Sequence, residues 1–166
     1  MRAFAVLLAA ALSLSASVAV ANDSKGRPHG FHGHCSVTAL SLNFGPYNPF
    51  RAGHTDSTGK IAVSCAGKPG DTVAYTIELS AGSSGTFAQR RMRAYGTHTL
   101  NYNIYVGASR SLVWGDGNSG TSIFTDTFVQ TPGKSTRNYP VYGRIFSGQN
   151  PFVGTYVDSI VVTLNF

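Results

Sequence analysis

Three histidines near the start of the sequence, His29, His32 and His34, have the spacing H-x-x-H-x-H in a polar, glycine-containing stretch. Imidazoles at this spacing can hold copper, nickel or zinc weakly. The alternative, which we favour, is a solvated tail, so no metal site is predicted. Further along, DGNSG from Asp116 to Gly120 has some features of a calcium loop but lacks its acidic ligands, and a hairpin turn explains it better.

Residue types suited to catalysis are present without a catalytic pattern. Serine, histidine and aspartate all occur, but no G-x-S-x-G motif indicates a hydrolase nucleophile. Paired-carboxylate chemistry requires two acids close together, whereas the 7 acidic residues stand mostly near predicted turns. The sequence therefore predicts neither an enzyme nor a cofactor.

The first 21 residues have the pattern of a secretory signal peptide, with a basic start at Met1-Arg2, an apolar run from Phe4 to Leu14 and an A-x-A site at Ala19-Val20-Ala21. Cleavage is expected before Asn22. A membrane anchor is the alternative, but the run is short for a bilayer span, so no stable membrane insertion is predicted. The expected segments are a signal peptide at 1–21, a flexible His/Gly-rich extension at 22–34 and a folded domain at 35–166.

Cys35 and Cys65 are the only cysteines in the sequence. An even count in an exported chain indicates a disulfide, which would close a loop of about 30 residues and contribute roughly 3–4 kcal/mol. Free thiols or metal ligands are the alternative, although two cysteines so far apart with no second pair make a poor zinc site.

The chain is basic, with 13 Lys and Arg against 7 Asp and Glu, and a net charge of +6. Charged residues make up only 12% of it, and the one cluster is Arg90, Arg91 and Arg93. A nucleic-acid interface requires a denser basic stripe, so nucleic acid is not a predicted partner. We interpret the charge as an aid to solubility, with some attraction to anionic cell surfaces.

From Cys35 onwards, short runs with apolar residues at every second position alternate with Gly, Pro, Asn and Ser. This period is typical of β-strands, and no segment after the signal peptide has a convincing helical period. Roughly seven or eight such strands predict an all-β sandwich. The sets of residues predicted to share one face of a strand are Leu40, Leu42 and Phe44; Ile61, Val63 and Cys65; Val73, Tyr75, Ile77 and Leu79; and Leu100, Tyr102, Ile104 and Val106.

The closing run GTYVDSIVVTLNF also alternates, with Tyr156, Asp158, Ile160, Val162, Leu164 and Phe166 on one face. With the block RMRAYGTHTLNYNIYVGASRSLVW, the stretch LSLNFGPYNPF and the cysteine pair, it makes residues 35–166 resemble a spore coat protein U domain. The most specific parts are L-x-Y-x-x-Y (Leu100, Tyr102, Tyr105) and the closing G-x-Y-x-D-x-I-x-V-x-L-x-F. This family includes the pilin subunits of archaic chaperone–usher pili.

The resemblance implies an immunoglobulin-like β-sandwich that lacks its last strand, completed by donor-strand complementation in the periplasm of a Gram-negative bacterium. The partners it implies are a periplasmic pilus chaperone that lends a strand beside the terminal one, an outer-membrane usher, and other pilin subunits. Ile160, Val162, Leu164 and Phe166 would wall the open groove, and four or five apolar side chains filling it would contribute on the order of 6–15 kcal/mol before ordering costs. A complete sandwich with an ordinary last strand is the alternative.

Tyr156 and Asp158 complete the set of expected interface residues. Asp158 shares the apolar face, and we expect it near the solvent end of the strand, accepting hydrogen bonds from backbone or hydroxyl groups.

The stretch NDSKGRPHGFHGH before Cys35 departs from a donor strand, since Phe31 is its only large apolar residue and glycines and a proline interrupt it. Three explanations stay open: a fibre tip that only accepts a strand, a secreted coat protein that forms no fibres, or a pH- or metal-dependent contact through the histidines.

The predicted function is a structural subunit of a chaperone–usher pilus, fibre or surface coat that passes through the periplasm to the cell surface and supports adhesion or biofilm. The alternative is a non-polymerising coat protein or a carbohydrate-binding sandwich. A carbohydrate-binding domain would use exposed aromatic residues such as Tyr47, Phe50 or Trp114.

Overall fold

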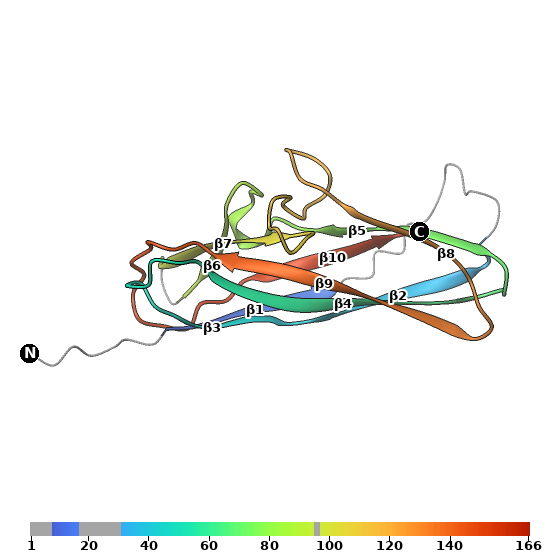
Figure 1. The fold of residues 1–166 in the computed structure, drawn as a ribbon, viewed down its shortest axis with the longest axis horizontal. Helices are drawn as coiled ribbons and strands as arrows, with labels where there is room; N and C mark the ends of the chain where they lie inside the picture. The colour runs from blue at the N-terminus through green and yellow to red at the C-terminus, as the bar shows by residue number, and fades with distance from the viewer. Residues whose placement is uncertain (1–7, 17–30, 95–96) are drawn as a thin grey trace, which may run out of the picture.

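The computed structural model describes residues 8–16, 31–94 and 97–166, which form β-strands joined by turns and loops (Figure 1). The strands are β1 (Leu8–Ala16), β2 (Gly33–Leu40), β3 (Leu42–Tyr47), β4 (Thr55–Gly67), β5 (Thr72–Leu79), β6 (Arg90–Arg93), β7 (Thr99–Tyr105), β8 (Phe124–Val129), β9 (Lys134–Ile145) and β10 (Ser159–Asn165). A single 3-10 turn, η1 (Gly82–Ser84), is the helical element of these residues. No helix in the described ranges has the length and apolar character needed to cross a membrane. The predicted all-β class is confirmed.

Two five-stranded sheets pack face to face in an elongated sandwich (Figure 1). One has the order β2-β4-β9-β7-β6, and we call it the disulfide sheet because β2 and β4 carry Cys35 and Cys65. The other has the order β3-β1-β10-β5-β8, and we call it the terminal-strand sheet because it contains β10. The paired strands of both sheets are antiparallel except β1 and β10, which run parallel.

The core lies between the sheets and is built from the faces that alternation predicts. Alternating positions of a strand point to opposite sides of a sheet, so one face of each strand reaches the interior. The buried residues on these predicted faces are Ile61, Val63 and Cys65 on β4, Val73, Tyr75, Ile77 and Leu79 on β5, Leu100, Tyr102 and Ile104 on β7, and Ile160, Val162 and Leu164 on β10.

The segment from Cys35 to Phe44 differs from its predicted single face. The chain leaves the disulfide sheet after β2 and enters the terminal-strand sheet with β3, so it changes sheet at Ser41. Cys35 is buried before this point and Leu42 and Phe44 after it, and the buried positions shift from odd to even numbers. Leu40 stands at the crossover and is 54% exposed, so the prediction that it shares one face with Leu42 and Phe44 was wrong.

Candidate functional site

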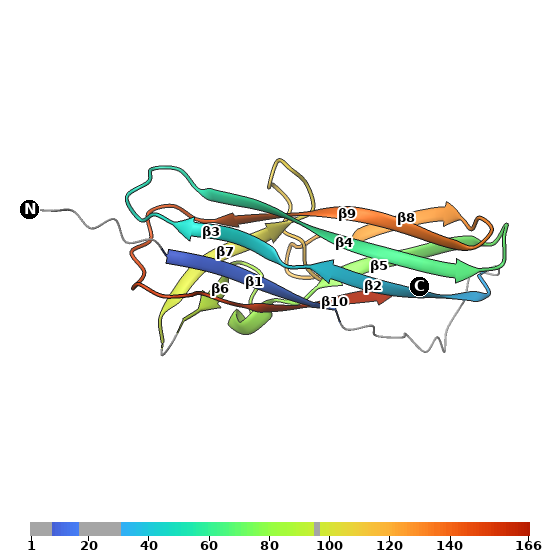
Figure 2. The ribbon, with the colours of Figure 1, turned by 90° about the horizontal axis from the view of Figure 1, so that it is seen from below.

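Strand β1 lies between β3 and β10 and completes the terminal-strand sheet (Figure 2). Its first half pairs antiparallel with β3, from Leu8 opposite Tyr47 to Leu12 opposite Leu42. Its second half pairs parallel with β10, from Ser13 opposite Ser159 to Ala16 opposite Val162. We call the positions that β1 occupies between these two strands the β3–β10 site.

The strand that fills the β3–β10 site comes from the predicted signal peptide. The cleavage motif of that signal peptide, Ala19-Val20-Ala21, lies outside the described residues. Among residues 31–94 and 97–166, no strand stands between β3 and β10, and β3 has no pairing in its sheet other than with β1. The incomplete sandwich expected from the resemblance is therefore found in the described part of the chain after the predicted signal peptide.

Of the residues predicted for a groove wall, Ile160 and Val162 are in register with β1, whereas Leu164 and Phe166 lie beyond the end of that pairing. Ile160, Val162 and Leu164 are fully buried, and Phe166 is half-buried. Phe166 meets the ring of Phe31 edge to face, with 6.3 Å between the ring centroids. On the β3 side, Leu42 and Tyr47 are also buried at register positions opposite β1. The terminal run does not indicate these two residues. The alternation of Leu40, Leu42 and Phe44 could have indicated Leu42, but Tyr47 is out of that period, and the β1–β3 register shifts between Ala10 and Ala11.

The other edge of β10 is held by β5, in antiparallel register from Val162 opposite Leu79 to Asn165 opposite Thr76. Just before this ladder, the N–H of Val161 donates to Ser80 Oγ at 2.9 Å, and the N–H of Ser80 donates to the carbonyl of Val161 at 3.0 Å. One edge of β10 is therefore paired within the folded domain, and the other edge is paired with β1.

Asp158 is buried, which corrects its expected place at the solvent end of the strand. Its predicted role as an acceptor is confirmed: the Tyr102 hydroxyl donates to Oδ2 at 2.7 Å, and the N–H of Ser83 donates to Oδ1 at 2.9 Å. A side chain at Gly82, which has φ of +68°, would collide with the carboxylate. Burial, followed by the charge of Asp158, raises the pKa of Tyr102 and keeps this phenol protonated. The carboxylate therefore ties the start of β10 to η1 and to β7.

The run from Tyr156 to Phe166 is not one continuous strand. Val157 exchanges two backbone hydrogen bonds with Arg93 of β6, at 2.8 and 2.9 Å, before the chain joins the terminal-strand sheet as β10. Tyr156 is fully buried at this crossing, and its hydroxyl donates to the carbonyl of Phe152 at 2.9 Å. Tyr156 and Asp158 thus position β10, and their direct contact with a partner strand stays a prediction.

The sequence comparisons agree with this architecture. Residues 30–163 match the family model described as the Spore Coat Protein U domain. The chain belongs to this family. It is also 32% identical over 147 residues to Protein U of Myxococcus xanthus, an alignment that covers 81% of this chain and 78% of that protein.

Two solved structures resemble the spore coat protein U domain described here. A chain of the CsuC–CsuE chaperone–tip adhesion subunit pre-assembly complex, from the archaic chaperone–usher Csu pili of Acinetobacter baumannii, matches with a TM-score of 0.55 and 22% identity. The match covers 81% of this chain and 40% of that chain, so it establishes a shared fold. A chaperone–tip adhesin complex of CFA/I fimbriae matches at 10% identity over 88% of this chain and 40% of that one, with a TM-score of 0.45, which is too low to support a conclusion.

Arg90 of the spore coat protein U domain is fully buried, so the interpretation of the Arg90 cluster as surface charge was wrong for this residue. Its guanidinium donates to the carbonyls of Ser80 and Trp114, both at 2.7 Å, and to Asn103 Oδ1 at 2.8 Å. Burial lowers the pKa of Arg90 to about 10, so it stays protonated at neutral pH. No local pattern in the sequence distinguishes it from Arg91, because its acceptors come from three distant segments.

The structure places the cysteines and the histidines in different settings. Cys35 and Cys65 are bonded across β2 and β4 as predicted, at opposed register positions. His29 lies outside the described residues, and His34 is already part of β2. The backbone N–H of His32 donates to Asp71 Oδ2 at 2.9 Å. Within the described ranges, no three metal-binding side chains gather in one place.

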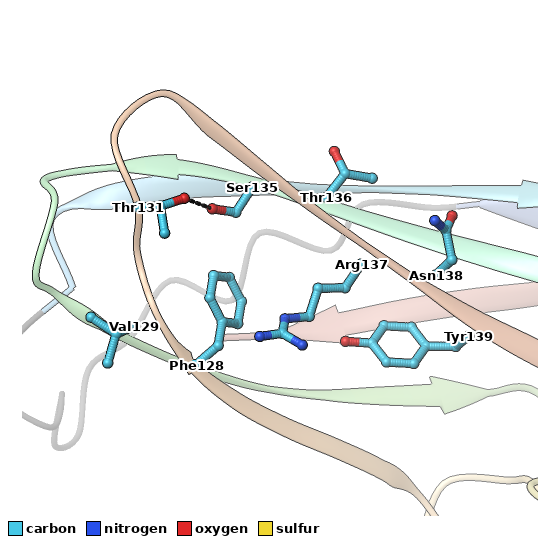
Figure 3. Close-up of a pocket in the computed structure, with 8 residues that line it drawn as sticks. All are labelled: Phe128, Val129, Thr131, Ser135, Thr136, Arg137, Asn138 and Tyr139. Atoms are coloured by element: carbon cyan, nitrogen blue, oxygen red, sulfur yellow. Dashed lines mark hydrogen bonds between the residues drawn. The ribbon is translucent and has the colours of Figure 1, made fainter.

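A second candidate site is a hollow of about 580 Å³ beside β8 and β9, lined in part by Phe128, Arg137 and Tyr139 (Figure 3). The guanidinium of Arg137 lies 4.6 Å from the centre of the Phe128 ring, and its Nε is 3.5 Å from Asp126 Oδ2. A sugar would stack on the face of an aromatic ring such as that of Phe128. Here the guanidinium of Arg137 already covers one face of this ring.

The aromatic residues expected on a carbohydrate-binding surface are mostly internal. Tyr47 and Trp114 are buried, which corrects that expectation, and the Trp114 indole N–H donates to the carbonyl of Ile77 at 2.9 Å. Phe50 is exposed, at 89% of its surface. These contacts give the sugar-binding alternative little support.

Proposed function

We propose that this chain is an exported, non-enzymatic subunit of a chaperone–usher type surface fibre or coat, and that it accepts a β-strand from a partner at the β3–β10 site. The observation that carries the proposal is the origin of β1. The one strand that bridges β3 and β10 belongs to the segment predicted to be removed during export. The first partner would be a periplasmic chaperone, and an usher and a neighbouring subunit would follow.

Loss of β1 would leave both backbone groups and apolar side chains without their partners. The backbone N–H and C=O groups that β3 and β10 direct towards β1 would lose their partners, and an open edge of this kind recruits another strand. Leu42, Ile160 and Val162, now fully buried, would lose part of their cover. Covering apolar side chains again contributes about 1.5–3 kcal/mol for each one fully buried. A strand with apolar residues at alternate positions satisfies both demands.

The structure favours a subunit that accepts a strand over a subunit that donates one. Phe31 is the one large apolar residue in the predicted extension, and it already packs against Phe166 of its own domain. The extension then has no large apolar residue left to insert into a partner. This favours a fibre tip or a non-polymerising coat protein over a shaft subunit. Attachment of cells to surfaces or to one another is the role we propose for such a tip or coat.

Co-expression of the full chain with a periplasmic pilus chaperone and an usher encoded by genes that neighbour its own, where such genes occur, followed by affinity purification from the periplasm, tests the proposal. We expect the exported chain to purify as an equimolar complex with the chaperone and to be degraded without it. Val162→Asp, opposite β1 and buried, should abolish the complex, while Val161→Asp, on the exposed face of the same strand, should retain it. A partner-free monomer that lacks residues 1–21 and is as stable as the full chain would contradict the proposal.

A further inference from the structure

The segment that forms β1 has the sequence properties of a donor strand, which an ordinary apolar signal sequence does not need. Residues 12–16 read Leu-Ser-Leu-Ser-Ala, with the larger apolar residues at every second position. The register places Leu12 opposite Leu42, Leu14 opposite Ile160, and Ala16 opposite Val162.

The neighbours of β1 follow the same alternation. Leu42, Ile160 and Val162 are fully buried, whereas Ser159 and Val161, opposite Ser13 and Ser15, are exposed. Apolar residues of β1 therefore share register positions with buried residues of β3 and β10, and serines share them with exposed ones. A shift by one residue would reverse this match, because the side-chain period of a strand is two.

The connection from β1 to the folded domain is long enough for this placement. β1 runs parallel to β10 and ends opposite Val162, four residues before Phe166, which corresponds to about 13 Å along the strand. Phe31 is beside Phe166, with the ring centroids 6.3 Å apart. Fourteen residues, 17–30, join Ala16 to Phe31, and a chain of this length can span up to about 46 Å.

We propose that Leu8–Ala16 is an intramolecular donor strand for as long as it stays attached, so that the uncleaved chain is closed to partner strands and cleavage opens the β3–β10 site. This inference rests on the proposed function, because it names the occupant of the same site before assembly. A tethered strand competes at an effective concentration in the millimolar range. A free strand at micromolar concentration would be outcompeted, and separation of residues 1–21 would remove the competitor.

The first test is a cross-link in the full chain of 166 residues, refolded from denaturant with the Cys35–Cys65 bond formed. Ser15→Cys with Val161→Cys places two thiols at opposed positions, and Ser15→Cys with Val157→Cys is the matched control on another exposed valine. We expect the first pair to form a disulfide in most molecules and the control pair to form almost none, as read by mass spectrometry of proteolytic peptides. Equal cross-linking of both pairs would overturn the proposed register.

The second test measures access to the site with a fluorescent peptide of sequence LAAALSLSA that carries a lysine tag. Leu14→Asp, opposite buried Ile160, should release β1 and strengthen peptide binding on the order of a hundredfold over the unaltered full chain. Ser15→Asp, opposite exposed Val161, should bind the peptide as weakly as the unaltered chain.

The two tests separate this inference from the proposed function. Failure of the cross-link together with tight peptide binding by the unaltered chain would overturn the inference and leave a strand-accepting site. Failure of the cross-link with no peptide binding by any variant would count against both. A cross-link at Val161 without a gain of binding in Leu14→Asp would overturn the claim that β1 blocks the site.

Discussion

The two sheets of the sandwich are held together in different ways. The disulfide sheet contains the longest ladder, β4 with β9, from Thr55 opposite Ile145 to Ala66 opposite Lys134, and a covalent bond joins β2 to β4. All of its strands come from the predicted folded domain and its immediate border. In the terminal-strand sheet, β3 is joined to β10 only through β1, a segment of the predicted signal peptide.

This difference means that one sheet of the domain can be stable while the other sheet is incomplete. A domain can be exported and begin to fold on one self-sufficient sheet while its second sheet still lacks a strand. We propose that the place of the missing strand is a binding site, whose affinity would come from the same backbone pairing and apolar burial that stabilise a domain. The two sheets should therefore respond differently to perturbation.

Removal of the disulfide should have the largest effect. Cys35→Ser with Cys65→Ser leaves the strand pairing in place but frees a loop with a sequence separation of 30 residues. We expect a loss of roughly 3–4 kcal/mol in the free energy of unfolding, because the unfolded chain gains entropy. Urea unfolding of the full chain, oxidised and variant, measures it. An unchanged midpoint would mean that the disulfide sheet does not limit stability.

Loss of the Asp158 carboxylate should have the next largest effect. Asp158→Ala leaves the Tyr102 hydroxyl and the Ser83 N–H without their acceptor in a buried place, at an expected cost of about 2–4 kcal/mol. Asp158→Asn keeps one acceptor oxygen and should cost less. Equal, small losses in urea unfolding of both variants would show that the carboxylate does not tie β10 to η1 and β7.

A matched pair of core truncations compares the sheets directly. Ile61 in β4 and Ile160 in β10 are both fully buried in the full chain. Each change to alanine should destabilise the full chain, but Ile160→Ala should cost about 1–2 kcal/mol less in residues 22–166, where its cover is already incomplete. Ile61→Ala should cost the same in both. Identical penalties for Ile160→Ala in the two chains would mean that β1 does not cover it.

Ionisation of the Tyr102 phenol should have a smaller, pH-dependent effect on the free energy of unfolding. Burial raises its pKa in the folded state above the value of about 10 in the unfolded chain. Its contribution is therefore complete below pH 10 and declines as the pH rises beyond it, by up to about 1.4 kcal/mol per pH unit. Tyr102→Phe should flatten this decline between pH 10 and 11 in urea unfolding, whatever its effect at pH 7. An unchanged slope would contradict burial of this phenol.

The sequence predicted those parts of the fold that depend on local periodicity. Val73, Tyr75, Ile77 and Leu79 share a buried face because a strand alternates wherever one side meets a core. The prediction for Leu40 failed because the chain changes sheet at this point, and that crossover depends on packing with the rest of the domain. The prediction that Arg90 contributes surface charge failed because its carbonyl acceptors come together only in the folded chain.

The site was predicted in part. The β10 residues Ile160 and Val162 were identified through the closing run, and the structure adds their opposite wall on β3. The position of β1 was not predicted, because an apolar signal sequence and a donor strand share their composition. The alternation Leu12-Ser13-Leu14-Ser15-Ala16 was the available signal, and only a register between strands gives it meaning.

Amide hydrogen exchange read by mass spectrometry, on the full chain and on residues 22–166 prepared under the same conditions, tests the central claim most directly. If β1 supplies a strand that the domain lacks, the amides of β3 and β10 should exchange at least about tenfold faster in the shorter chain, while β4 and β9 keep their protection. Equal protection of β3 and β10 in the two chains would contradict the claim.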